Sequence, residues 1–285
     1  LKRVVMIGDH RQLPPVVKNV GFKTYCRLDQ SMFARFVRLG VPSIQLDAQG
    51  RARPTLARLY SWCYDELGDL PSTSRGIYEI ENPGFVHELQ FVNVGDYHGR
   101  GEIEPTPHFY QNLGEAEYVV NVFQYMRLIG YPASKISIIT TYRGQKHLIR
   151  DIIARRCAHH PLFGVPSRVT TVDKYQGQQN DYVLLSLVRT RSVGHMRDIR
   201  RMVVALSRAR LGLYVFGCMP LFERCIELSK SIRNFLEYPT KLALVPTESY
   251  PSEMIRKQKA TPYLVEDATA MGHVVNQLAV KFGFG

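Results

Sequence analysis

The segments R-V-T-T-V-D-K-Y-Q-G-Q-Q-N-D-Y-V-L-L-S-L-V-R-T-R (168–191) and R-R-M-V-V-A-L-S-R-A-R (200–210) decide the fold of this chain. Short apolar runs between polar turns predict strands over 169–171, 182–188 and 211–216, with a helix over 196–208. Gln176 and Gly177 form the predicted turn between the first two strands. A strand, polar loop, strand, helix and strand in succession indicate an α/β domain whose functional loops lie at strand ends.

The same alternation of strands and helices continues along the chain in both directions. Further strands are predicted over 44–46, 85–94 and 136–141, and further helices over 55–67, 114–129, 145–156 and 221–236. Pro54 suits the first turn of the helix over 55–67. Residues 95–107 are predicted to form an irregular insertion. The whole pattern predicts a parallel sheet flanked by helices.

The two terminal segments follow other patterns. Val4–Ile7 predicts a buried strand, and G-D-H-R-Q-L-P-P (8–15) predicts a loop at its carboxyl end, where open α/β sheets bind ligands. A short amphipathic helix is predicted over 31–39. Prolines interrupt residues 240–285, which are predicted to form an extension with a helix near 270–280. The chain begins without a methionine, and we expect it to be a fragment of a longer protein.

Composition narrows the class of partner. The 285 residues are 45% hydrophobic, which is enough for a buried core, and their net charge is +12. Such an excess favours a polyanionic partner, with nucleic acid first; a basic surface kept for solubility is the alternative. The five cysteines form no C-x-x-C pair, which argues against a zinc site and suits a reducing compartment. No metal site and no membrane helix are predicted.

Three side chains suit the chemistry of phosphoryl transfer. That reaction needs a phosphate cradle, a magnesium site, a positioned water and arginines that balance the charge of the transition state. The cradle sequence G-x-x-x-x-G-K-[ST] is absent from the chain. Gln12 is a candidate sensor of the γ-phosphate or water, and Arg51 and Arg208 are candidate arginine fingers. A lone arginine is more often a surface residue, but two within patterned segments favour the functional interpretation.

Five segments resemble the motifs of superfamily-one helicases of the Upf-like branch, in the same order and with similar spacing. They are G-D-H-R-Q-L-P-P, Q-G-R-A-R-P, I-T-T-Y-R-G-Q, V-D-K-Y-Q-G-Q-Q-N-D and V-A-L-S-R-A-R, and the resemblance extends from Val4 to about Phe235. Within this branch the chain is most similar to the intron-binding helicases of the spliceosome. The resemblance implies the end of a first RecA-like domain over 1–40, a second RecA-like helicase domain over 41–238 and a carboxy-terminal extension over 239–285.

The resemblance also implies roles for individual residues. Catalytic roles are implied for Gln12, Arg51 and Arg208, and contacts with ATP for Gln49, Gly177 and Gln179. RNA contacts, through hydroxyls or backbone amides, are implied for Pro14, Thr140, Thr141, Tyr142, Thr170, Thr171 and Gln176. ATP and Mg²⁺ would be held mainly by the first motor domain. Because phosphate contacts set position without reading sequence, such contacts suit a translocating motor.

The implied function is that of an ATP-dependent RNA helicase in pre-mRNA splicing. Its partners would be intron RNA upstream of the branch site and spliceosomal proteins of the intron-binding complex, in the nucleus, without a membrane and without an obligate homo-oligomer. Two alternatives remain: a non-enzymatic helicase-like scaffold in a ribonucleoprotein, and a DNA helicase of the same superfamily. On its own, the chain is expected to lack ATPase activity because the phosphate cradle is missing.

Some positions depart from the family pattern, and some have competing structural interpretations. Gln179 stands where the family usually has glutamate, so a charge near the nucleotide is lost. Seven arginines between 189 and 210 could follow phosphates, or they could pair with carboxylates such as Asp198. Tyr142 and Tyr175 could stack on bases, although aromatic residues at strand ends are more often packed.

Overall fold

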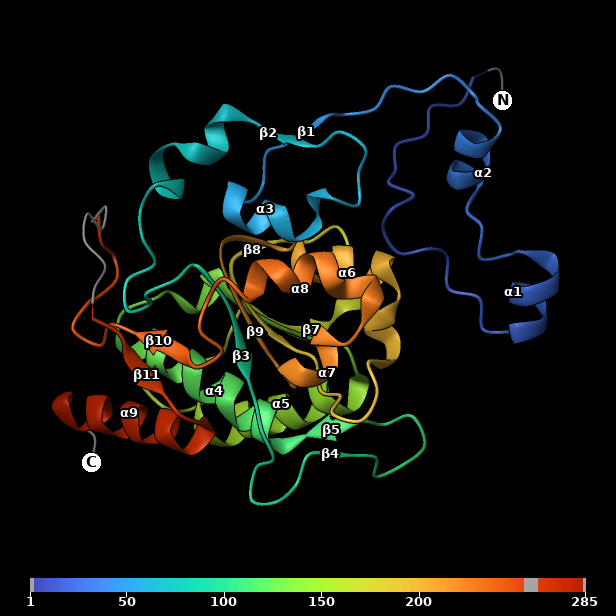
Figure 1. Ribbon diagram of the computed structural model, residues 1–285. Helices are drawn as coiled ribbons and strands as arrows, with labels where there is room; N and C mark the ends of the chain where they lie inside the picture. Colours follow the sequence, from blue (N-terminus) through green and yellow to red (C-terminus); the bar gives the residue numbers. More distant parts are fainter. Residues whose placement is uncertain (1–2, 254–260, 284–285) are drawn as a thin grey trace.

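Five parallel strands form the central sheet in a computed structural model that describes residues 3–253 and 261–283 (Figure 1). The strands are β3 (Leu89–Asn93), β6 (Ile136–Thr140), β7 (Arg168–Thr171), β8 (Asn180–Ser186) and β9 (Ala209–Gly217). Their order across the sheet is β3-β9-β8-β6-β7, and every neighbouring pair is parallel. The α/β class with a parallel sheet flanked by helices, predicted from the sequence, is confirmed.

One face of the sheet is covered by α4 (Leu113–Leu128) and α5 (Arg143–Arg156), and α9 (Ala268–Lys281) packs against α4. In Figure 1, α9 lies on the outer side of α4. Met271, Val274 and Val275 of α9 belong to the same buried cluster as the apolar residues of α4. α4 is therefore buried on nearly all sides, which explains why its apolar residues are not confined to one stripe.

The other face is covered by α3 (Pro54–Ser61), α6 (Ile199–Leu206), α7 (Met219–Glu223) and α8 (Ser229–Phe235). The single helix predicted over 221–236 is wrong, because Cys225 has an extended backbone and separates α7 from α8. The buried residues of this region keep helical spacing across the break, so the spacing could not reveal it; they are Phe222, Cys225, Leu228, Ile232 and Phe235. The helix over 55–67 is confirmed in a shorter form, with Pro54 in its first turn.

Short elements complete the main body. β1 (Ala48–Gln49) pairs with β2 (Gly68–Asp69) in parallel; β4 (Glu102–Ile103) with β5 (Gln111–Asn112), and β10 (Leu242–Leu244) with β11 (Tyr263–Val265), pair antiparallel. The 3₁₀ turns are η1 (Pro71–Ser74), η2 (Gly76–Tyr78), η3 (Ala133–Lys135), η4 (Val172–Lys174), η5 (Gly194–Arg197) and η6 (Ile226–Leu228). The strand predicted over 44–46 is wrong: Ile44 is 94% exposed, and the strand begins at Ala48.

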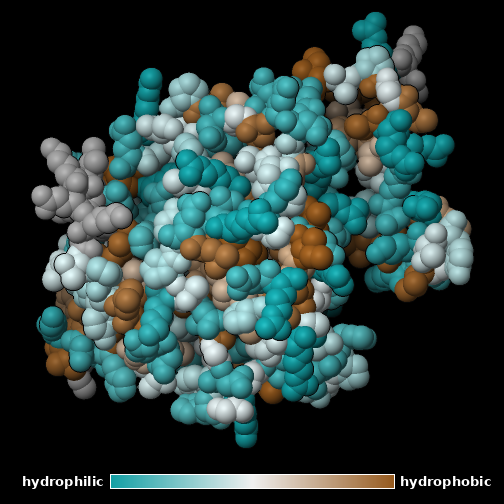
Figure 2. Space-filling view, in the orientation of Figure 1, coloured by the Kyte–Doolittle hydropathy of each residue, from teal (hydrophilic) through white to brown (hydrophobic). Residues whose placement is uncertain are grey.

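The amino-terminal arm carries α1 (Val20–Cys26) and α2 (Met32–Arg38), and Figure 1 shows it beside the main body. Ser31 caps the amino terminus of α2, as expected for the helix predicted over 31–39. The buried strand predicted over Val4–Ile7 is wrong: Val5 is 88% exposed and Ile7 97%. An extended segment becomes a strand only beside a hydrogen-bonding neighbour, and none lies beside it in the described ranges. Figure 2 shows apolar residues on the surface of this arm.

Residues 263–281 pack against the main body through β11 and α9, and the helix predicted near 270–280 is confirmed. The domain boundaries at 40 and 238 stay predictions. Among residues 3–253 and 261–283, no helix is long and apolar enough to cross a membrane. No cluster of three or more His, Cys, Asp or Glu side chains suited to a metal ion occurs in those same ranges.

Candidate functional site

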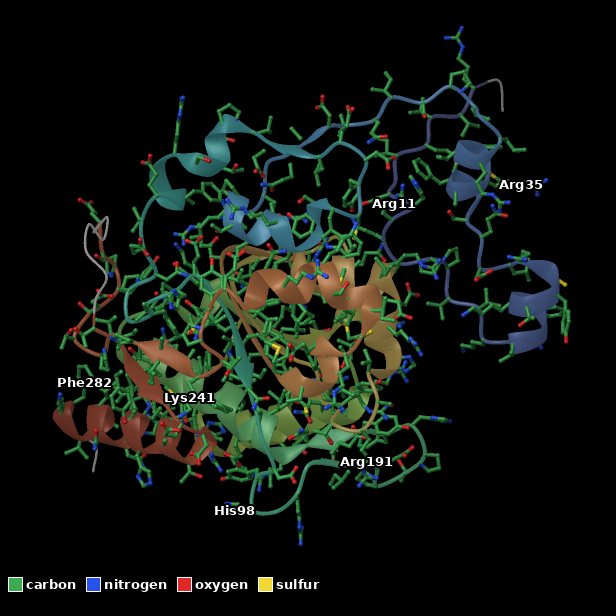
Figure 3. The ribbon with its side chains drawn as sticks, viewed as in Figure 1. Arg11, Arg35, His98, Arg191, Lys241 and Phe282 are labelled. Atoms are coloured by element: carbon green, nitrogen blue, oxygen red, sulfur yellow. The ribbon has the colours of Figure 1, made fainter. Side chains whose placement is uncertain are left out.

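The predicted site residues lie at two opposite edges of the sheet. Arg208 and Gln179 directly precede β9 and β8, so they lie at the amino-terminal edge. Thr140 and Thr171 end β6 and β7 at the carboxyl edge. Two residues labelled in Figure 3 help to locate these edges: Arg11, near α3, lies on the side of the amino-terminal edge, and Arg191, near β5, lies on the side of the carboxyl edge.

Arg208 is the centre of the amino-terminal edge and is only 1% exposed. Its Nε donates to the carbonyl oxygen of Val204 at 2.9 Å, and its Nη1 donates to that of Gln178 at 3.3 Å. Its Nη2 donates to the hydroxyl of Ser207 at 2.5 Å. All of these partners are uncharged, so they fix the orientation of the guanidinium without neutralising it.

The amino-terminal loop brings Gln12 to this arginine. The Nη2 of Arg208 lies 3.5 Å from the Oε1 of Gln12. The Nε2 of Gln12 donates to Asp9 Oδ2 at 2.7 Å, and the hydroxyl of Tyr64 donates to the same oxygen at 2.7 Å. Asp9 therefore ties the loop both to Gln12 and to the segment that follows α3.

Arg51 lies beside Arg208 and is oriented by Gln179. The Nε of Arg51 donates to Gln179 Oε1 at 2.6 Å, and its Nη1 donates to the Ser207 carbonyl oxygen at 3.0 Å. The backbone N–H groups of Arg51 and Ala52 both donate to Gln49 Oε1 at 2.8 Å. Gln49 thus shapes the turn that presents Arg51, and its side chain is engaged in that turn.

Neither arginine has an acidic partner among the residues that the structure describes. In the described ranges, the ion pairs include neither Arg51 nor Arg208. A buried cation without a counter-ion is costly. Accordingly, burial and the neighbouring charge of Arg51 lower the pKa of Arg208 to about 10, which still leaves it protonated at neutral pH. This edge can therefore bind an anion with two cationic side chains whose charges are not already used.

The turn at Gln176 and Gly177 is exposed and lies between the two edges in the chain. Gly177 has a φ of +79°, a conformation that glycine adopts without strain. Beneath the turn, the Tyr175 hydroxyl donates to Ser137 Oγ at 2.9 Å, and the ring is 1% exposed. Base stacking on Tyr175 is thus excluded in this conformation, and the alternative that its ring is packed inside the protein is correct.

The carboxyl edge presents its predicted RNA-binding residues differently from the sequence hypothesis. Thr140 and Tyr142 are 0% and 4% exposed. The hydroxyl of Thr141 donates to the Leu187 carbonyl oxygen at 3.0 Å, and the Tyr142 hydroxyl accepts from the His195 amide at 3.1 Å. Hydroxyl contacts with RNA from Thr140 and Thr141, and stacking on Tyr142, are excluded in this conformation because these groups are buried in the protein.

The amino-terminal end of α5 lies at the same edge. α5 begins at the exposed Arg143 and no side chain caps its first turn, while the next two residues, Gly144 and Gln145, are buried. Lys146, in the second turn, has a pKa lowered by burial and by the nearby charges of Lys174, Arg150 and Arg143. Like charges thus gather at this end of the helix. In β7, Thr170 is partly buried and Thr171 is 6% exposed. Pro14, in the amino-terminal arm, is also partly buried.

Most of the arginines between 189 and 210 are paired with carboxylates. The pairs are Arg189–Glu102, Arg197–Glu227, Arg200–Asp198, Arg201–Asp173 and Arg210–Asp181, with N···O distances of 2.7–3.0 Å. In the described part of the chain, Arg191 and Arg208 are the members of this set outside ion pairs. The alternative of paired arginines is therefore correct for five of the seven.

The sequence hypothesis missed several polar residues that organise both edges. Tyr64 and Ser207 hold the groups around Arg208. Glu115 is 0% exposed at the carboxyl edge, and Glu102 is 6% exposed there. Ser207 and Asp9 stand inside the quoted motifs, so their positions beside Arg208 and Gln12 were a usable signal. Nothing in the local sequence distinguishes Glu115 from an exposed glutamate in the first turn of a helix.

Comparison with known families fits this geometry. The family model described as "AAA domain" matches residues 28–220, which include the whole parallel sheet. The chain belongs to the AAA domain family. The five-stranded parallel sheet flanked by helices is the RecA-like architecture that the sequence motifs implied, and this prediction is confirmed.

Individual relatives are helicases and splicing factors by name. The chain is 56% identical over 277 residues to the mouse (Mus musculus) protein named RNA helicase aquarius, which covers 97% of this chain and 19% of that protein. It is 33% identical to pre-mRNA-splicing factor cwf11 of Schizosaccharomyces pombe, over 88% of this chain and 20% of that protein. It is 34% identical to an Arabidopsis thaliana homologue of regulator of nonsense transcripts 1, over 76% and 18%. The chain thus spans about a fifth of the length of these relatives.

Proposed function

We propose that the chain is the second motor domain of an ATP-dependent RNA helicase that acts on intron RNA in pre-mRNA splicing. The observation that carries this proposal is the pair of arginines at the amino-terminal edge, Arg51 and Arg208, whose charges no carboxylate within 3–253 or 261–283 neutralises. Its relatives are named as RNA helicase and splicing factor, which supports RNA as the substrate and the nucleus as the location. Spliceosomal proteins are the proposed protein partners, and no obligate homo-oligomer is proposed.

ATP fits this edge because its phosphates supply the missing negative charge. When bound with Mg²⁺, which a preceding RecA-like domain would hold, ATP supplies the γ-phosphoryl group. Arg208 and Arg51 then balance the charge that develops on the phosphoryl oxygens during transfer to water. Gln12, held by Asp9, orients groups near the γ-phosphate, while Gln49, Gly177 and Gln179 shape the site. Because these hydrogen bonds fix the orientation of both arginines within the protein, little reorganisation is required in the transition state.

The carboxyl edge is the proposed RNA site. The cations Arg143, Lys146 and Lys174, at and near the positive end of the α5 dipole, bind phosphates there, which suits a sequence-independent track. Thr170, Thr171 and the exposed Gln176 continue this surface toward the nucleotide edge. The buried residues Thr140, Thr141 and Tyr142 hold this edge in place through their contacts inside the protein. Pro14, two residues after Gln12 in the amino-terminal arm, is a further proposed RNA contact.

The test is ATP turnover by the longer protein that contains this chain. We expect single-stranded RNA to stimulate its turnover severalfold, while the 285-residue chain alone shows none because it lacks the phosphate cradle. Steady-state phosphate release with and without RNA measures both. A longer protein that binds RNA but hydrolyses no ATP would contradict the motor and favour a scaffold.

Gln179→Glu is expected to weaken ATP binding. A carboxylate 2.6 Å from the Arg51 Nε would form an ion pair and draw charge away from the nucleotide. Because the site is partly exposed, the effect is modest, a rise in the KM for ATP of about two- to fivefold. The neighbouring exposed Gln178→Glu is the matched control, since its side chain does not bind Arg51. Equal KM values for the two variants would count against a role for Gln179 at the nucleotide.

A further inference from the structure

The strand β8 ends in a strained turn at the carboxyl edge. Val188 has a φ of +75°, and the Arg189 amide donates to the Leu187 carbonyl oxygen at 2.9 Å. These two features define a γ-turn of the rare, strained type with a positive central φ. A β-branched residue is a poor choice for this conformation, because its Cβ substituents crowd the backbone. Strain of this kind persists only where the surroundings hold it, and it concentrates at functional sites.

The surroundings that hold it come mainly from the amino terminus of α4. Glu115 Oε2 accepts from the Val188 amide at 2.8 Å and from the Ser186 hydroxyl at 2.6 Å. The Val188 carbonyl oxygen accepts from Asn112 Nδ2 at 3.2 Å. Both backbone polar groups of Val188 are thus bound by two side chains that are themselves buried. Glu115 makes its two short bonds to Ser186, the last residue of β8, and to Val188 in the turn, and it is in no ion pair of the described residues.

The turn determines where the next residues go. The Glu102 carboxylate accepts from the Arg189 Nε at 2.9 Å and from the Thr190 amide at 2.6 Å, so the segment runs along β4. Arg189 is fixed there over the ring of Tyr110, with 3.9 Å between its Cζ and the ring centroid. Arg191 follows, exposed and outside the ion pairs of the described chain, on the side of the molecule that carries β5 (Figure 3).

We infer that Glu115 is a positioning residue for nucleic-acid binding: it holds the strained γ-turn at Val188 and so aims the side chain of Arg191 at an RNA phosphate. This inference rests on the proposed function, because it uses the carboxyl edge as the RNA site. Glu115 itself touches no RNA. Its burial raises its own pKa to about 8, which agrees with a carboxyl group kept for its bonds to one turn rather than for charge at the surface.

The test uses variants that distinguish three properties: the hydrogen bond from the Val188 amide to Glu115, the charge of the Glu115 carboxylate, and the backbone strain at Val188. Glu115→Met keeps the length of the side chain but offers the Val188 amide no oxygen acceptor, whereas Glu115→Gln retains one. Val188→Gly removes the strain, since glycine adopts a positive φ readily. The Kd for a single-stranded oligo(U) RNA is measured in the longer protein, together with kcat at saturating RNA and the exchange rate of amides 187–191.

We expect Glu115→Met to raise the Kd for RNA about tenfold, as for a lost charge-assisted contact, and to leave kcat at saturating RNA unchanged. Amide exchange over 187–191 should be faster in this variant. Glu115→Gln should stay within about twofold of the wild type in Kd. The double variant Glu115→Met/Val188→Gly should recover both RNA affinity and amide protection, a rescue that a purely structural role for Glu115 would not show.

Two results would overturn the inference: an unchanged Kd in folded Glu115→Met, or no recovery in the double variant. Absence of RNA binding by the wild-type protein would instead overturn the proposed function, and with it the RNA part of this inference. The exchange rates then still decide whether Glu115 holds the turn, because equal rates in wild type and Glu115→Met would refute it.

Discussion

Arg208→Ala is expected to abolish ATP turnover by the longer protein, lowering kcat by about 10³-fold or more, the loss typical of an arginine finger. The guanidinium is 1% exposed and fixed by three uncharged partners. In the proposed function it therefore brings an oriented charge, unpaired among the described residues, to the γ-phosphate. Alanine removes that charge, and water cannot replace it with comparable orientation. Steady-state phosphate release at saturating ATP and RNA measures the effect.

Arg210→Ala is the matched control for this experiment. Arg210 lies two residues further along and pairs with Asp181 at 2.7 Å, so its charge is already engaged. Its loss should change kcat by less than about threefold, in line with a partly exposed ion pair. Arg208→Lys should not rescue, because an ammonium cannot reproduce the planar fork of donors. A kcat of Arg208→Ala within tenfold of the wild type would refute the finger assignment.

Met271→Asp is expected to destabilise the whole sheet domain by more than about 3 kcal/mol, because it buries a charge without a partner. Met271 is 0% exposed in the contact between α9 and α4. If residues 263–281 are an integral layer of the sheet domain, the entire domain should unfold in one cooperative transition at lower denaturant. Urea unfolding of the 285-residue chain, followed by circular dichroism and tyrosine fluorescence, measures this.

Gln277→Asp is the control, since Gln277 lies on the exposed face of the same helix. The free energy of unfolding of this variant should differ from that of the wild type by no more than about 0.5 kcal/mol. A Met271→Asp variant whose sheet unfolds at the wild-type midpoint, after a separate early loss of α9, would show that 239–285 is an independent extension, as the boundary at 238 predicts.

The fold was predictable where the spacing of apolar residues in the sequence matches their burial in the structure. The strands β6, β8 and β9 are apolar and lie inside the sheet, so their sequence alone indicates a buried strand. Val4–Ile7 has the same character, yet it is exposed because no strand of the described ranges pairs with it. Pairing is a property of the neighbours, and a run of four apolar residues contains no information about them.

The sequence indicated which residues are candidates for the site, but not how deeply they are buried or which hydrogen bonds they make. Gln12, Arg51, Gln179 and Arg208 of the quoted motifs lie together at one edge, and their roles at a nucleotide stay predictions. The motifs did not reveal that the hydroxyl of Thr141 is used internally. Nor could they indicate which arginines find carboxylates, since partners such as Glu102 and Arg189 are far apart in sequence. Burial and long-range pairing are decided by the tertiary structure.

The position of α4 between the sheet and α9 has a consequence for synthesis. α4 ends at Leu128, and its outer covering does not begin until Ala268. A ribosome completes the sheet strands first and releases residues 268–281 much later. Throughout that interval the outer side of α4 is an apolar surface without cover, the kind of surface that chaperones bind and that promotes aggregation. Any truncation before Ala268 would make that temporary exposure permanent, and expression of shortened versions should therefore yield insoluble protein.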